Sequence, residues 1–182
     1  MPAFTNNVMR RIRMNNPILI SGPSGCGKTE FVELIARENN IKLYEIDFSV
    51  GVTESNLIGR MHVNNGETVF SYGNVPKAMK EGWLLLDEID FAEPEHLACL
   101  QSILTGKPLI VTQNKSEIIY PHENFRIFAT ANTKGRGDES QSYTGTKILN
   151  ISFIDRFSIF EMKYTNKEFT IINNIIDDTN LS

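Results

Sequence analysis

Short apolar runs alternate along the chain with stretches in which apolar residues recur every three or four positions. The short runs are typical of strands buried on both faces, and the longer stretches are typical of amphipathic helices. The core strands are expected at 17–21, 42–49, 83–90, 125–132 and 158–164, and the helices at 28–39, 54–60, 75–82, 94–106, 148–157 and 166–178. This order predicts an α/β fold, a three-layer sandwich with a central parallel sheet.

Two further stretches predict β-hairpins inserted between these elements. Residues 62–72 carry β-forming residues on both sides of Asn-Asn-Gly, which is a turn signal. Residues 108–120 predict a second hairpin that turns at Gln113–Ser116. The polar, glycine-rich stretch 133–147 is expected to be a loop.

The sequence GPSGCGKT at 22–29 lies between the first predicted strand and the first long helix. This context is the one a phosphate-binding P-loop needs, because glycines and the helix N-terminus direct several backbone N–H groups at one anion. Lys28 would add a full charge at the β- and γ-phosphates, and the Thr29 hydroxyl would ligate Mg²⁺. The predicted nucleotide-binding residues are Gly22, Pro23, Ser24, Gly25, Cys26, Gly27, Lys28, Thr29 and Glu30.

Two acids follow the most apolar strand, in the sequence WLLLDEID at 83–90. They stand at the carboxyl end of a buried strand, the edge where α/β folds bind ligands. Asp87 is predicted to hold Mg²⁺ and Glu88 to orient and deprotonate the attacking water. Asp90 is expected to be structural or to cap the following helix.

Two polar residues further along complete the candidate site. Asn132 ends the strand at 125–132 and would position the lytic water and touch the γ-phosphate, while Arg156 in DRF would stabilise transition-state charge. Taken singly, the asparagine is equally a turn residue and the arginine a surface ion pair. A guanylate-kinase-like enzyme also uses GPSGxGK, but it has no need of the acid pair at Asp87 and Glu88.

The P-loop, the acid pair, the asparagine and the arginine, in this order, resemble the AAA+ ATPases. The chain is similar to the MoxR and dynein-related branch, and most resembles the CobS-type ATPase subunit of aerobic cobaltochelatase. The specific part is PHENFRIFATANTKGRGD at 121–138, followed by YTGTK at 143–147 and IDRF at 154–157. By this resemblance, Asn132 is sensor 1, Arg156 is an arginine finger for a neighbouring subunit, and both hairpins face a central pore.

The resemblance implies Mg²⁺-dependent ATP hydrolysis by a homo-oligomeric ring, a hexamer, that remodels a partner protein or complex. Residues 1–165 are expected to form the AAA+ core, and 166–182 the start of a lid helix or a C-terminal tail. The helical lid is expected to be largely absent, so that the chain is either a fragment or a compact relative. Two alternatives stay open: a nucleotide-gated assembly or binding module with little turnover, and a small-molecule P-loop kinase.

The composition of the chain argues against several classes of protein. The 182 residues include 41% hydrophobic ones, enough for a buried core, and the net charge of −4 argues against nucleic acid as a partner. No long apolar segment or signal peptide is found, so neither a membrane span nor secretion is expected. The two cysteines, Cys26 and Cys99, indicate no disulfide framework and fit the reducing cytoplasm. His62, His96 and His122 show no metal-ligand spacing.

Overall fold

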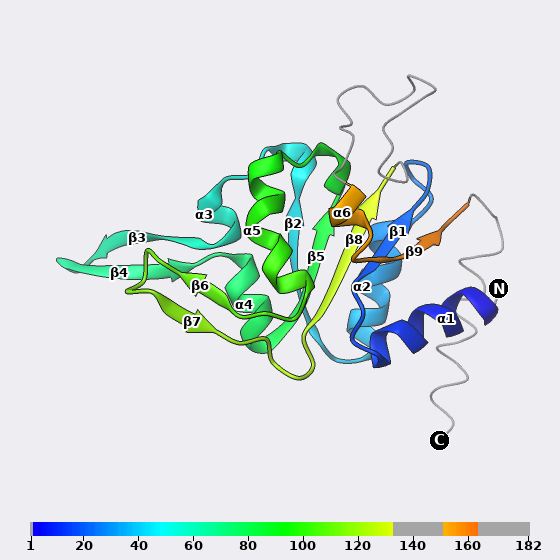
Figure 1. Ribbon diagram of the computed structural model, residues 1–182, viewed down its shortest axis with the longest axis horizontal. Helices are drawn as coiled ribbons and strands as arrows, with labels where there is room; N and C mark the ends of the chain where they lie inside the picture. The colour runs from blue at the N-terminus through cyan, green and yellow to red at the C-terminus, as the bar shows by residue number, and fades with distance from the viewer. Residues whose placement is uncertain (1, 133–150, 164–182) are drawn as a thin grey trace.

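The computed structural model describes residues 2–132 and 151–163. Its centre is a five-stranded sheet in the order β2-β5-β8-β1-β9, and every neighbouring pair is parallel (Figure 1). The strands are β1 (Ile18–Ser21), β2 (Lys42–Asp47), β5 (Gly82–Asp87), β8 (Arg126–Ala131) and β9 (Ser158–Glu161). The predicted α/β class and parallel sheet are thereby confirmed.

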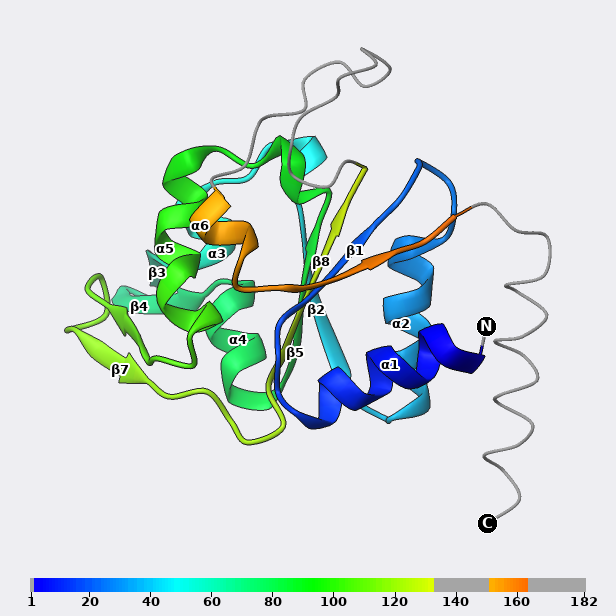
Figure 2. The same ribbon diagram turned by 45° about the vertical axis from the view of Figure 1, so that its right-hand side comes forward.

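Helices cover both faces of this sheet, as Figures 1 and 2 show. One face carries α1 (Pro2–Arg13) and α2 (Lys28–Glu38), and the other carries α4 (Asn74–Glu81) and α5 (Pro94–Leu104). Successive strand residues point to opposite faces, so the buried side chains form two clusters, one under each helical layer. In α1, Val8 and Ile12 are buried while the arginines at 10, 11 and 13 are exposed, which matches a solvated helix face.

Some element ends differ from the sequence expectation. The strand expected at 42–49 ends at Asp47, because the Asp47 carboxylate accepts a hydrogen bond from the Ser49 backbone N–H and a 3-10 turn, η1 (Phe48–Val50), begins there. The strand expected at 83–90 ends at Asp87 and is followed by η2 (Ile89–Phe91). The short helices are α3 (Glu54–Leu57) and α6 (Ile151–Ile154). The predicted loop at 133–147 and helix at 166–178 lie outside the described residues.

Both predicted hairpins are present as separate two-stranded antiparallel sheets. The first joins β3 (Gly59–Asn64) to β4 (Glu67–Tyr72), and the second joins β6 (Leu109–Val111) to β7 (Glu117–Ile119). The first turn has positive φ at Asn65 (50°) and Gly66 (83°), as the Asn-Gly pair of a tight hairpin turn requires. The hairpins extend from the same side of the molecule (Figure 1).

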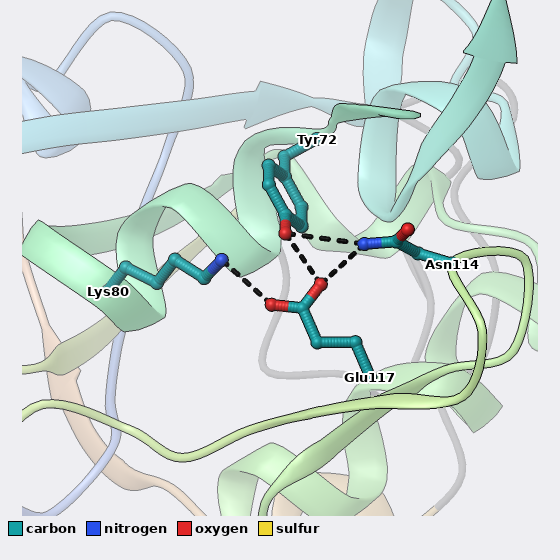
Figure 3. A network of polar contacts seen from close by, with 4 residues as sticks. All are labelled: Tyr72, Lys80, Asn114 and Glu117. Carbon is teal, nitrogen blue, oxygen red and sulfur yellow. Dashed lines mark hydrogen bonds and ion pairs between the residues drawn. The ribbon is translucent and has the colours of Figure 1, made fainter. Parts of the chain in front are cut away.

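A polar network at Glu117 joins the two hairpins (Figure 3). Its carboxylate accepts hydrogen bonds from the Tyr72 hydroxyl (2.5 Å) and the Asn114 side-chain amide (2.6 Å). Its other oxygen pairs with Lys80 Nζ of α4 at 3.0 Å, and the same ammonium lies 3.8 Å from the centre of the Tyr72 ring. One carboxylate therefore holds β4, α4 and the second hairpin together.

Within residues 2–132 and 151–163, no helix combines the length and apolar composition that crossing a bilayer requires.

Candidate nucleotide-hydrolysis site

The loop from Gly22 to Gly27 joins β1 to α2 at the carboxyl edge of the sheet (Figure 2). Gly25 (φ 75°) and Gly27 (φ 86°) take left-handed backbone conformations that disfavour other residues. A Cβ atom on Gly22 would lie 2.2 Å from the Met162 carbonyl oxygen, so only glycine fits beside the end of β9. Among the described residues no side chain caps α2 at Gly27, which leaves its first N–H groups available to an anion.

Lys28 is the first residue of α2, and its side chain is buried, with 6% exposure. Its ammonium donates to the Gly22 carbonyl (2.9 Å), the Pro23 carbonyl (3.1 Å) and the Asn132 side-chain oxygen (3.0 Å). These acceptors match the three hydrogens of an ammonium group, which makes the burial of its charge tolerable. The lysine is thus held between the P-loop and the end of β8.

Asp87 and Thr29 lie together, as the sequence predicted. Thr29 Oγ1 donates to Asp87 Oδ1 over 2.8 Å, and Asp87 ends the fully buried strand β5. The same carboxylate oxygen accepts a hydrogen bond from Thr130 Oγ1. These groups are hard oxygen donors of the kind that Mg²⁺ prefers.

Glu88 follows Asp87 in the left-handed region, with φ 50° and ψ 49°. A residue with a side chain is held in this region at a cost of about 1–3 kcal/mol, and such conformations cluster at functional sites. Burial, the largest cause, raises the pKa of Glu88 above its ordinary value of 4.5, and the neighbouring charge of Asp87 raises it further. A hydrogen bond from Asn132 Nδ2 to Glu88 Oε1, 3.5 Å long, lowers this pKa in part.

Asn132 therefore contacts both the P-loop lysine Lys28 and the candidate base Glu88. Its backbone N–H donates to Asp90 Oδ2 over 3.0 Å, and Asp90 is fully buried. This burial and this hydrogen bond agree with the structural role expected for Asp90. Its expected role as the cap of the next helix is wrong, because the N-cap of α5 is Glu93.

Thr130 was missed from the sequence. It lies two residues before Asn132, in the strand sequence RIFATA, and its side chain is fully buried. The Thr130 hydroxyl donates its proton to Asp87 and accepts a hydrogen bond from the backbone N–H of Glu88. A polar residue inside an otherwise apolar strand was the available signal.

The remaining predicted site residues are those of the P-loop and Arg156. Ser24 and Glu30 are exposed, whereas Cys26 is buried beneath the loop. Arg156 follows α6 and donates to the Ser152 carbonyl oxygen of its own helical turn. Among the described residues, no recorded hydrogen bond or ion pair joins Arg156 to the cluster around Lys28 and Asp87.

A family model described as the AAA domain (dynein-related subfamily) matches residues 17–146. An uncharacterized protein of Staphylococcus epidermidis is 31% identical over 158 residues, which are 84% of this chain and 57% of that protein. The aerobic cobaltochelatase subunit CobS of Sinorhizobium sp. is 33% identical over 150 residues, 80% of this chain and 45% of the subunit. The chain thus spans about half the length of these relatives.

Among solved structures, the crystal structure of a proposed ATPase from Cytophaga hutchinsonii matches with a TM-score of 0.70. It is 21% identical in sequence, and the match covers 98% of this chain and 51% of that chain. At this level of identity the likeness bears on the fold alone.

Proposed function

The chain belongs to the dynein-related AAA family, within the MoxR and CobS type of AAA+ ATPase, and from that premise we propose that it hydrolyses ATP to ADP and phosphate to remodel a partner protein or complex. One observation carries the proposal. A P-loop lysine, a hydroxyl–carboxylate pair, a partly buried glutamate and a bridging asparagine meet at one edge of the sheet. Each is a part that γ-phosphate hydrolysis needs.

The donor set fits Mg²⁺. Thr29 Oγ1 uses its proton on Asp87, which leaves the oxygen lone pairs of the threonine for a cation beside a carboxylate. We assign Thr29 and Asp87 as the residues that would hold the ion. When bound, Mg²⁺ would neutralise charge on the β- and γ-phosphate oxygens.

The protein residues would divide the remaining work. Lys28 would exchange its carbonyl and amide acceptors for phosphate oxygens, which offer a charge-assisted partner. Glu88, held beside the end of β5, would accept a proton from the attacking water, and its raised pKa makes it a stronger base than an exposed glutamate. Asn132 would orient that water, because its amide already reaches the Glu88 carboxylate.

Arg156 fits the role of a finger supplied to a neighbouring copy. Among the described residues it contacts its own helical turn and not its own P-loop cluster, so we assign it to the γ-phosphate of an adjacent copy. A homo-oligomeric ring, a hexamer by analogy with the family, would complete each site from the adjacent subunit. One relative is described as a subunit of cobaltochelatase, which supports a chain that works in an assembly with other proteins.

The same observation about Arg156 favours a second candidate function. An isolated chain would bind ATP but turn it over slowly, and would then act as a nucleotide-gated binding module.

Phosphate release measured against protein concentration tests the proposal. We expect a rate per subunit that climbs with concentration, because assembly completes the sites. Glu88→Gln is the control for contaminating ATPases, since it should retain ATP binding and lose turnover. ATP binding with a negligible rate at every concentration would favour the binding module, and absence of ATP binding would contradict both candidates.

A further inference from the structure

We propose that Thr130 is a positioning residue of the hydrolytic site, which orients the Asp87 carboxylate and the Glu88 backbone through one hydroxyl group. This inference rests on the proposed ATP hydrolysis and deepens it. Thr130 lies in β8, which runs beside β5 in the register Leu86↔Ala129, so that Thr130 falls next to Asp87. Its side chain is fully buried, and water cannot replace its contacts.

The chemistry of its partners fixes the direction of both hydrogen bonds. The Glu88 backbone N–H can only donate, so Thr130 Oγ1 accepts at 2.9 Å. The hydroxyl proton is then left for Asp87 Oδ1, which as a carboxylate oxygen can only accept. A continuous chain runs from the Glu88 N–H through the threonine hydroxyl to the Asp87 carboxylate.

This chain constrains the two acids at once. Asp87 Oδ1 receives hydroxyl groups from two sides, Thr130 of β8 and Thr29 of α2, which sets the rotation of the carboxylate. Glu88 stands in a left-handed conformation with no side-chain cap, and the bond to Thr130 holds its backbone there. Without the hydroxyl, the turn after β5 would be free to relax, and Asp87 would keep, among the described residues, only the hydrogen bond from Thr29.

A purely structural threonine would fill space in β8, and its hydroxyl would be irrelevant to turnover. Two substitutions separate these roles. Thr130→Val keeps the shape and removes the hydroxyl, whereas Thr130→Ser keeps the hydroxyl and removes a methyl group. Ile127→Val is a matched control, because it trims a buried side chain of the same strand that makes no polar contact with the site.

Two measurements are made on each variant of the 182-residue chain. Steady-state phosphate release gives kcat and KM for ATP, and titration with a fluorescent, non-hydrolysable ATP analogue gives affinity with Mg²⁺ and with EDTA. Thr130→Val should lower kcat about 10- to 100-fold and reduce the gain in affinity that Mg²⁺ provides, as loss of a group that orients a metal ligand does. Its affinity in EDTA should stay near wild type, because the P-loop contacts remain. Thr130→Ser and Ile127→Val should resemble wild type in both measurements.

The proposal is overturned if Thr130→Val matches wild type in both measurements, or if Thr130→Ser loses as much as Thr130→Val. Should Thr130→Val fail to fold, Thr130→Ala against Thr130→Ser provides the same comparison of hydroxyl loss. A wild-type chain that binds Mg²⁺-ATP without hydrolysing it would contradict the proposed function, and Thr130 would still be judged by the binding measurement.

Discussion

Lys28 Nζ donates a 3.0 Å hydrogen bond to Asn132 Oδ1, although 104 positions separate the two residues in the chain. The bond joins the P-loop helix to the end of β8, and the other end of the same amide reaches Glu88. The P-loop lysine and the candidate base are therefore linked through one side chain. Under the proposed function, a phosphate would replace this amide as the partner of Lys28, and the Asn132 oxygen would then be available to water.

Lys28→Met should weaken ATP binding strongly, because it keeps the length of the side chain and removes the charge that pairs with phosphate. Truncation of one member of a buried, charge-assisted pair typically costs about 2–5 kcal/mol of binding. Titration with a fluorescent ATP analogue checks this prediction. Lys42→Met is the control, because Lys42 is exposed and paired with Glu81. An unchanged affinity in Lys28→Met would contradict the P-loop assignment.

The acid limb of the pH–rate profile should follow the titration of the Glu88 carboxylate. A base works only when deprotonated, so a raised pKa means that turnover rises with pH through a midpoint above 4.5. Asn132→Ala should slow turnover and also move this midpoint to higher pH, because it removes the hydrogen bond that lowers the pKa of Glu88. The measurement is kcat against pH at saturating ATP.

Asn124→Ala is the control for that profile, since Asn124 is an exposed asparagine in the loop before β8. It should leave the midpoint in place. If Asn132→Ala slows turnover without moving the acid limb, Asn132 acts on the water or the phosphate, and the contact with Glu88 has no catalytic consequence.

The sequence predicted most of the site because its signals are local. The P-loop has fixed spacing, and an apolar run ending in Asp87 indicates a buried strand whose last residue reaches the ligand edge. Thr130 was signalled only by being a polar residue in a mostly apolar strand, and its contacts with Asp87 and Glu88 depend on the register of β5 against β8, which the local sequence does not give. The left-handed turn at Glu88 was equally hidden, since glutamate has no preference for positive φ.

For the hairpins too, the local sequence predicted the elements but not the long-range contacts between them. The Asn-Gly turn signal predicted the first hairpin, and the apolar and polar pattern at 108–120 predicted the second, but the connection between them was not predictable. Tyr72 and Glu117 are 45 positions apart, and nothing in either local sequence indicates that they meet. A long-range hydrogen bond of this kind follows from how α4 packs against a strand of each hairpin, β4 and β7.

Tyr72→Phe should destabilise the connection between the hairpins. It removes the hydroxyl bonded to Glu117 and keeps the ring that packs beside Lys80. For a partly exposed site the expected loss is about 1 kcal/mol of unfolding free energy. The hydrogen bond from the Tyr72 hydroxyl is the largest cause of the lowered pKa of Glu117 in the folded protein. The stabilisation that this bond gives is therefore fully present above the pKa of Glu117 in the unfolded chain. It is lost as the pH falls through the lower pKa of the folded protein.

Chemical denaturation of wild type and Tyr72→Phe at neutral and acidic pH checks both parts of this prediction. The difference between the two proteins should shrink on acidification. Tyr120→Phe is the control, because Tyr120 is 70% exposed. A difference that is equal at both pH values would mean that the Tyr72 hydroxyl does not interact with the Glu117 carboxylate in solution.

Arg156→Ala should bind ATP normally and hydrolyse it slowly, if Arg156 completes the site of a neighbouring copy. Arginine fingers contribute about 10³–10⁵ in rate to phosphoryl transfer. If Arg156 has only a local role, Arg156→Ala should keep a hydrolysis rate near wild type, since the hydrogen bond to the Ser152 carbonyl stabilises only its own turn. Arg10→Ala, an exposed arginine on α1, is the control and should keep the wild-type rate. Phosphate release at a concentration where wild type is fully active provides the comparison.

Mixing Arg156→Ala with Glu88→Gln subunits separates a finger supplied in trans from one that acts within its own chain. Each variant alone should be nearly inactive. In a mixed ring, a Glu88→Gln subunit still carries Arg156, and an Arg156→Ala subunit still carries Glu88. Where these two intact residues meet at one interface, the site is complete and should hydrolyse ATP. The reverse interface carries both defects and stays inactive, so the mixture should recover only part of the wild-type rate. A mixture no more active than the average of its components would place Arg156 in its own chain's chemistry or outside catalysis altogether.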